Sequence, residues 1–350
     1  MKVVAPLAAL AFAACTAAPP ASSLSQSIIN GVADDGDPSV VAVFAYIPGQ
    51  PGAALCTGEV VSPHVVLTAA HCVSPKSVGN ATFLIYTGNS LVFDGTVPTT
   101  NTLATMEGEG NPSWPSSDTS TDSDPGDIGV VILAEPTGIP PLPYNRFALP
   151  DRLIEQQVRI VGYGLTDGND TAGTTAGTKH SAQTYLNYIR PDGIELWDNE
   201  HGTCEGDSGG PAFMMLNGKE RIAGVTAIGY KGCPVKLAAT DTRVDSFVSF
   251  VDGYVNRFDP AAVPPGGACT ADTDCGALPC LDGTCTPACD PTAASDSCPA
   301  GLACTSVDDE PMCKKPHHGC AFTPGAPASS PAELLFALAL LAVFALRRRA

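Results

Sequence analysis

Residues 202–211 read GTCEGDSGGP, and this stretch places a single serine, Ser208, between an aspartate and two glycines. Glycine is favoured where the backbone turns sharply or approaches a ligand closely, because it has no Cβ atom. Two interpretations follow: Ser208 is a nucleophile whose partners lie elsewhere in the chain, or it is a turn residue. A serine hydroxyl is a weak nucleophile and needs a base within hydrogen-bond reach, which in turn needs an orienting group.

A candidate base and a candidate orienting acid precede this serine. His71 lies in VVLTAAHC, just after a predicted strand, and Asp127 lies in GDIGVVIL, at the start of an apolar strand. The order histidine, aspartate, serine is that of the chymotrypsin arrangement and differs from the orders in subtilisins and α/β-hydrolases. The alternative interpretations are that His71 is a core histidine whose hydrogen bonds are satisfied, and that Asp127 is an acid that caps a strand. The remaining histidines lie in turns, polar loops or the tail: His64, His180, His201, His317 and His318.

The composition favours strands and loops over long charged helices. Only 15% of the 350 residues are charged, whereas 35 are glycine and 32 are proline. Acidic residues outnumber basic ones by 36 to 18, which gives a net charge of −18. This balance argues against nucleic-acid binding, which requires a basic face. The chain has no nucleotide-binding loop, and we expect no cofactor.

Short apolar runs rich in valine and isoleucine alternate with turn residues between residues 28 and 258. Clusters of proline, glycine, asparagine and aspartate separate these runs, as between strands. A helical period occurs only at 242–258, and residues 259–268 are a linker rich in proline and glycine. We therefore predict an all-β fold with one terminal helix. The predicted strands are 40–47, 59–70, 81–88, 129–135, 158–164 and 221–230.

Both ends of the chain are predicted to be targeting segments. Residues 1–15 combine an early lysine with an apolar run, which is typical of a signal peptide, and the FAAC ending at Cys15 resembles a bacterial lipobox. Residues 16–27 would be a short propeptide. The tail at 321–350 holds an apolar run shorter than the roughly 20 residues of a membrane span, followed by three arginines. With Cys320 before it, the tail resembles a myxobacterial-type C-terminal sorting signal.

These segments imply export, with transient membrane attachment through the tail and a location in the bacterial envelope, at the cell surface or secreted. The fourteen cysteines are then expected to pair. Nine of them lie between Cys269 and Cys320, and none of the spacings there is C-x-x-C, so we expect no metal. We predict a disulfide-stapled module at 269–320, because so short a segment cannot build an adequate core. Its connectivity stays open.

Four segments together resemble the trypsin/chymotrypsin-like (S1-type) serine protease family. LTAAHC, DIGVVIL and GDSGGP are similar to its three signature blocks, and IINGVADD, which begins at Ile28, is similar to its mature N-terminus. The resemblance covers residues 28–258 and implies a double six-stranded β-barrel of the chymotrypsin type with a C-terminal helix. It also implies a monomeric serine endopeptidase with protein or peptide substrates.

The resemblance assigns a role to each matching residue. Ser208 would attack the scissile carbonyl, His71 would take and return its proton, and Asp127 would orient the imidazole. The backbone N–H groups of Gly206 and Ser208 would form the oxyanion hole, where each donor contributes about 10²–10³ in rate. The opening question then has an answer, because a residue without a side chain lets its N–H face the developing oxyanion.

An internal ion pair and two disulfides are implied in the same way. The amine of Ile28, freed by cleavage after Ser27, would pair with Asp207 and shape the oxyanion loop. The activating cut departs from the family pattern, because no arginine or lysine precedes it. The implied disulfides are Cys56–Cys72 and Cys204–Cys233.

The implied specificity pocket differs from that of trypsin. Gly202 stands at the pocket floor, so a lysine or arginine side chain would enter without a counter-charge. Ala239 stands where glycine is usual and would narrow the cleft. We expect cleavage after uncharged, small to medium side chains. The implied substrate-binding residues are Gly202, Ala227, Ile228, Gly229 and Ala239.

A second class of function stays open. The chain would then be a catalytically weak protease homologue that acts as a surface binding or adhesion protein through its cysteine-rich module, since a fold does not determine a function. The intact histidine, aspartate and serine weigh against it.

Overall fold

The computed structural model describes residues 28–315, except 92, 116–125, 217, 290–297, 300 and 308–309. The predicted signal peptide, lipobox cysteine, propeptide, Cys320 and sorting tail lie outside the described residues. Within the described part of the chain, no helix combines the length and the apolar character that crossing a membrane requires.

The first half of the described chain closes into a β-barrel. Its strands pair in the order β2-β3-β4-β7-β6-β5, and valine and isoleucine side chains fill its core. Two short helices, α1 (Ala70–Val73) and α2 (Pro75–Val78), follow β4. The strands are β2 (Val40–Tyr46), β3 (Ala53–Ser62), β4 (Val65–Thr68), β5 (Thr82–Tyr86), β6 (Thr102–Gly110) and β7 (Gly129–Leu133).

Six strands of the second half close into another barrel, and β1 from the start of the described chain adds a seventh strand to this sheet. The order is β1-β9-β10-β13-β12-β11-β8, and β8 also pairs with β9. A 3₁₀ turn, η2 (Asp151–Leu153), precedes β8. The strands are β1 (Val32–Ala33), β8 (Gln157–Gly162), β9 (His180–Ile189), β10 (Gly193–Leu196), β11 (Pro211–Leu216), β12 (Lys219–Ile228) and β13 (Ala239–Arg243).

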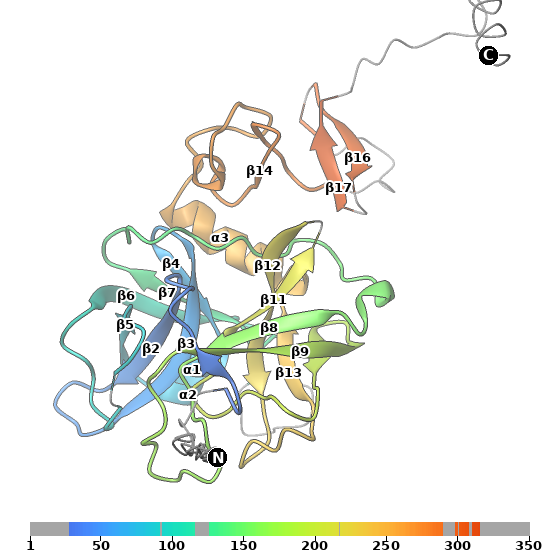
Figure 1. Cartoon of the computed structure of the whole chain (residues 1–350). Coiled ribbons are helices and arrows are strands. Elements are labelled where there is room, and N and C mark those ends of the chain that lie inside the picture. The colour runs from blue at the N-terminus through green and yellow to red at the C-terminus, as the bar shows by residue number, and fades with distance from the viewer. Residues whose placement is uncertain are drawn as a thin grey trace, which may run out of the picture.

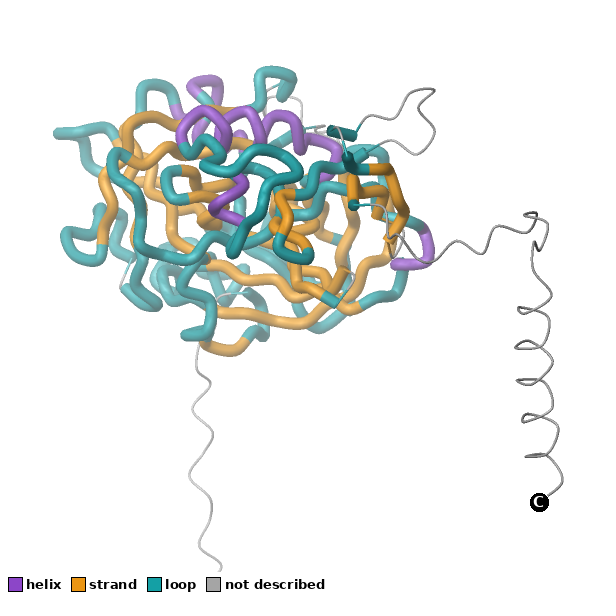
Figure 2. The backbone as a smooth tube through the Cα atoms, turned by 90° about the horizontal axis from the view of Figure 1, so that it is seen from above, coloured by secondary structure: helices purple, strands orange, loops and turns teal. Residues whose placement is uncertain are grey.

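The predicted terminal helix is confirmed as α3 (Val248–Phe258), which follows the 3₁₀ turn η3 (Asp245–Phe247). Val251 and Val255 are the buried residues of this helix. Figure 1 shows the two barrels side by side, with α3 running along their upper side. Figure 2 shows that strands and loops make up most of the described backbone. The double six-stranded β-barrel with a C-terminal helix, predicted from the sequence, is therefore confirmed.

The cysteine-rich region consists of two units with the same disulfide pattern. In each unit the first cysteine bonds the third and the second bonds the fourth. Each unit holds one two-stranded sheet, β14 (Cys280–Leu281) with β15 (Thr284–Cys285), and β16 (Ala303–Val307) with β17 (Glu310–Lys314). A 3₁₀ turn, η4 (Asp272–Cys275), lies in the first unit. The bonds are Cys269–Cys280, Cys275–Cys285, Cys289–Cys304 and Cys298–Cys313.

A half-buried polar cluster joins the two-barrel part of the chain to the first unit. The guanidinium of Arg146 donates to the Asp252 carboxylate on α3 at 2.6 Å and also to the carbonyl oxygen of Ala277. The hydroxyl of Tyr144 donates to the same carboxylate at 2.6 Å. A hydrogen-bonded charge pair is stronger than a neutral hydrogen bond. This cluster therefore ties the second half of the chain, α3 and the first unit together.

Candidate active site

The pairing of β4 with β7 brings His71 and Asp127 together. Thr68 lies opposite Gly129 in this ladder, so α1 begins where β7 begins. The His71 ring Nδ1 lies 2.7 Å from Oδ2 of Asp127, and the His71 backbone N–H donates to Oδ1 at 2.9 Å. Asp127 is 3% exposed. An ionised carboxylate can only accept, so Nδ1 carries the hydrogen and Nε2 is left as a proton acceptor.

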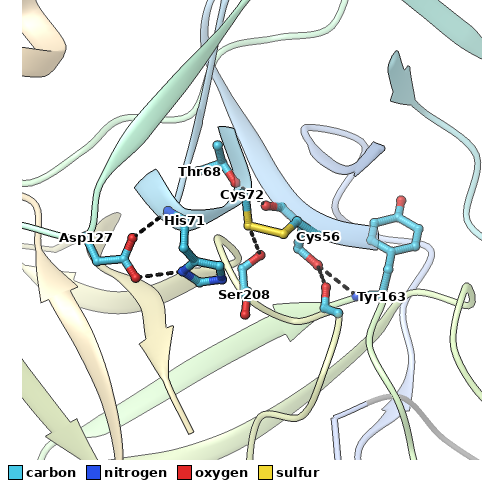
Figure 3. Close-up of a disulfide and its surroundings, with 9 residues drawn as sticks. Cys56, Thr68, His71, Cys72, Asp127, Tyr163 and Ser208 are labelled. Carbon is cyan, nitrogen blue, oxygen red and sulfur yellow. Dashed lines mark hydrogen bonds and ion pairs between the residues drawn. A yellow bond between two sulfur atoms is a disulfide. The ribbon is translucent and has the colours of Figure 1, made fainter. Parts of the chain in front are cut away.

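The loop that carries Ser208 comes from the second barrel, between β10 and β11. Its backbone is held on both sides, because Thr57 N–H donates to the Ser208 carbonyl at 2.9 Å and Gly209 N–H donates to Thr226 at 2.7 Å. Figure 3 shows the His71 imidazole lying between the Asp127 carboxylate and Ser208. A histidine held by an acid and facing a serine is the arrangement that can deprotonate the hydroxyl.

Two glycines of the loop are required by its close packing. Gly206 has a φ of +99°, and a Cβ there would lie 2.8 Å from the Cα of Gly164. Gly209 has a φ of +85°, and a Cβ there would lie 2.1 Å from the Thr68 hydroxyl. Side chains rarely tolerate such φ angles. The glycine density of the stretch therefore reflects both a turn and close backbone approach.

Asp207 lies fully buried behind this loop. Its carboxylate accepts from the backbone N–H groups of Gly164 at 2.7 Å and Cys204 at 2.8 Å, and also from the N–H of Ile28. Burial raises the pKa of Asp207 to about 7, against the lowering effect of these donors. Ile28 is fully buried as well and has a φ of +51°, which is an outlier for a β-branched residue. The structure thus brings together the two residues of the predicted activation pair.

The three residues assigned to the pocket floor and walls meet in one narrow pocket. Gly202, Gly229 and Ala239 all line it, and its volume is about 20 Å³. In this measure a cavity needs roughly 10–15 Å³ to hold one water molecule. Sequence reasoning missed further lining residues, which are Leu196, His201, Thr203, Tyr230, Cys233, Pro234 and Leu237.

Ala227 and Ile228 lie at the end of β12 and are not among the residues that line this pocket. The β12–β13 register shifts between Thr226 and Ile228, so Ala227 lies at an irregularity in the ladder. Both side chains are half-buried.

Two disulfides brace this site. Cys56–Cys72 joins β3 to α1 next to His71, and Cys204–Cys233 joins the serine loop to the loop that lines the pocket. These are the two pairings that the family resemblance implies. Among the described residues, the clusters that lie close enough to hold a metal contain only His71 and bonded cysteines, so their sulfurs are not thiolate ligands. These cysteines are Cys56, Cys72, Cys269, Cys275, Cys285, Cys289, Cys298 and Cys304.

Two buried carboxyl groups were missed by sequence reasoning. Glu59 on β3 and Asp241 on β13 are fully buried, and neither carboxyl group has a hydrogen-bond partner among the described residues. Burial raises the pKa of both groups, that of Asp241 to about 8, and the charge of Asp241 adds to the rise for Glu59. The available sequence signal was an acid inside an otherwise buried strand, in CTGEVV and ATDTR.

Comparisons with known proteins agree with this geometry. The family model described as Trypsin matches residues 28–251. The chain is 28% identical to chymotrypsin-like elastase family member 1 of Macaca fascicularis, over 59% of this chain and 81% of that protein. It is 26% identical to the protein of the same name from Rattus norvegicus, over 60% and 82%. It is also 25% identical to serine protease Hayan of Drosophila melanogaster, over 62% of this chain and 38% of that protein.

Proposed function

Because the chain belongs to the trypsin family of serine proteases, we propose that it is an exported serine endopeptidase that hydrolyses peptide bonds through an acyl-enzyme. The observation that carries this proposal is the hydrogen-bonded pair of His71 and Asp127 beside Ser208. His71 lies in α1, Asp127 lies just before β7, and Ser208 comes from a loop of the other barrel.

In the proposed reaction the Ser208 hydroxyl attacks the scissile carbonyl, and Nε2 of His71 takes its proton. The peptide C–N bond then breaks, and the imidazolium returns the proton to the leaving amine. Asp127 holds the imidazole with the hydrogen on Nδ1 and stabilises the imidazolium. Water then attacks the acyl-enzyme by the same route. The N–H groups of Gly206 and Ser208 would stabilise the oxyanion, by about 10²–10³ in rate for each donor.

We further propose that cleavage between Ser27 and Ile28 completes the site. The new amine of Ile28 would replace the amide N–H that contacts Asp207 and would carry a positive charge. An opposite charge nearby favours the ionised carboxylate. Cleavage also removes the peptide bond that defines the unfavourable φ of Ile28. Both effects favour the same arrangement of the oxyanion loop.

The specificity proposal is cleavage after uncharged, small to medium side chains. It is supported by the narrow pocket with Gly202 at its floor, where a cationic side chain would find no carboxylate. Ala227, Ile228 and Gly229 would bind the substrate backbone along the end of β12.

The proposed organisation follows the sequence boundaries. Residues 28–258 would form the protease domain, 259–268 the linker and 269–320 the cysteine-rich module, between the processed segments 1–27 and 321–350. Six disulfides support an oxidising compartment outside the cytoplasm. Attachment to a bacterial envelope through the tail and a monomeric state belong to this proposal.

Labelling by a fluorophosphonate probe tests the proposal. The protein is prepared with Ile28 at its N-terminus, and we expect covalent labelling and peptide hydrolysis that Ser208→Ala abolishes. Ser246→Ala, which changes an exposed serine bonded to the Pro191 carbonyl, is the matched control and should keep both. Absence of labelling in correctly processed, folded protein would support the binding-protein alternative instead. Cleavage of a peptide library chiefly after arginine or lysine would refute the specificity proposal.

A further inference from the structure

One titratable side chain of the narrow pocket belongs to no family role named above. His201 lines the pocket next to Gly202, and its ring Nδ1 lies 2.6 Å from Oδ2 of Asp198. The same carboxylate accepts from the backbone N–H groups of His201 at 2.7 Å and Glu200 at 2.8 Å. Asp198 therefore holds both the loop and the orientation of the imidazole.

The contact with Asp198 determines the hydrogen-bonding character of the ring. A carboxylate accepts, so Nδ1 donates, and Nε2 of the neutral imidazole is a hydrogen-bond acceptor. Among the residues that the structure describes, none makes a hydrogen bond to Nε2 of His201. The pocket thus contains a wall residue with an acceptor atom for which the described residues supply no donor.

The N-terminal segment of the mature form holds this wall in place. Ile29 N–H donates to the Gly202 carbonyl at 2.8 Å, and the Asn30 side-chain amide donates to the Glu200 carbonyl at 2.6 Å. These contacts flank His201 on both sides. The position of the imidazole is therefore built into the fold and does not depend on a surface loop alone.

The rest of the pocket restricts the side chain that could meet this acceptor. Its volume of about 20 Å³ leaves room for a short group only. Leu196, Pro234 and Leu237 supply apolar walls, and Ala239 adds a methyl group. An acidic substrate side chain would place its carboxylate against the lone pair of Nε2, which cannot donate a hydrogen bond to it. The negative charge of Asp198 on the other side of the ring would also repel it. A short side chain with a hydroxyl group fits the small pocket and can donate a hydrogen bond to Nε2.

We propose that His201, held by Asp198, is a specificity-determining residue that selects short hydroxyl-bearing side chains, threonine and serine, at the position before the scissile bond. This inference rests on the proposed protease function and deepens it. The hydroxyl would donate to Nε2, and an apolar side chain of the same shape would leave this acceptor unpaired. A site built to bond a hydroxyl discriminates against the analogue that lacks it.

Isosteric substrates test the proposal. Peptides that differ only in threonine or valine before the cleaved bond are compared by kcat/KM at pH 8, with protein that begins at Ile28. We expect threonine to exceed valine by about 3- to 10-fold, the range of one net hydrogen bond. In His201→Phe the ratio should fall to about one, because the acceptor for the threonine hydroxyl is lost. Asp198→Asn, which weakens the carboxylate contacts to the ring and to the loop backbone, should reduce the ratio in part.

The outcomes separate this inference from the function on which it rests. Turnover with equal threonine and valine rates, or a ratio unchanged in His201→Phe, would overturn the inference and leave the protease intact. Preference for an aspartate substrate over threonine would overturn it too. Loss of turnover for every substrate, together with no fluorophosphonate labelling, would overturn the proposed function itself. If His201→Phe does not fold, His201→Ala, which is smaller and also lacks the acceptor, supplies the same comparison.

Discussion

Removal of one buried carboxyl group should make this protein more stable, and by an amount that depends on pH. Asp241 lies on β13, opposite Ile194 of β10 and Thr226 of β12 in the ladders. Its Cβ would lie 2.9 Å from a Cβ at Gly224, so the surroundings are close-packed. The carboxyl group is fully buried without a hydrogen-bond partner among the described residues. The substitution Asp241→Asn keeps the shape of the side chain but replaces the carboxyl group with an amide that cannot ionise.

The sign follows from the raised pKa. Burial raises the pKa of Asp241 to about 8 in the folded protein, whereas an unfolded chain has a value of about 3.9. Between these values the unfolded chain releases a proton that the native state retains, so the free energy of unfolding falls as pH rises. The slope for one group is about 1.4 kcal/mol per pH unit. The stability that the native state has through keeping the Asp241 carboxyl group protonated is fully present below pH ~4. It falls as pH rises and is lost by pH ~8.

The free energy of unfolding is measured by urea denaturation at pH 5, 6 and 7, with disulfides intact and in a Ser208→Ala background that prevents self-digestion. The difference between Asp241→Asn and its parent should grow in favour of the variant by about 3 kcal/mol from pH 5 to pH 7. The exposed Asp151→Asn is the control for a general charge effect. A difference that stays constant with pH, or a variant that loses stability as pH rises, would refute the reasoning.

Three further variants test the site and its attachment to the rest of the chain. Asp127→Asn should lower kcat by about 10⁴-fold with little change in thermal stability, because the imidazole would hold its hydrogen on the wrong nitrogen; a fall below tenfold in steady-state assays would contradict this. Gly206→Ala should lower kcat by at least about 10²-fold, since its Cβ meets Gly164 and displaces an oxyanion donor; unchanged kcat would exclude that role. Arg146→Met, which breaks the contact with Asp252, should speed limited proteolysis in the linker and leave peptide turnover unchanged, and equal digestion rates would argue against this attachment.

The sequence by itself predicted much of the fold, because local patterns carry that information. Runs of valine and isoleucine between turn residues predicted β2, β5, β7 and β8, and helical spacing predicted α3. Five strands of the two barrels were missed, namely β6, β9, β10, β11 and β13, and β9 and β11 show why. β9 reads HSAQTYLNYI and alternates only weakly, and β11 reads PAFMML, without valine or isoleucine. Their strand state depends on pairing with neighbours, which β-propensity alone does not report.

The candidate triad could be named from the sequence because a histidine, an aspartate and a serine stood in short, recognisable stretches, while their roles stay predictions. What the tertiary structure decided is how side chains from different strands and loops meet. The β4–β7 ladder brings His71 to Asp127, the Asp198 loop turns His201 toward the pocket, and Asp241 is enclosed without a partner. The contact of His71 with Asp127 and the enclosure of Asp241 depend on residues far apart in the chain. The Asp198–His201 contact spans only three residues, but Ile29 and Asn30 hold its loop in place. Burial and the loss of solvent set the energies of these contacts, and the order of residues alone does not give them.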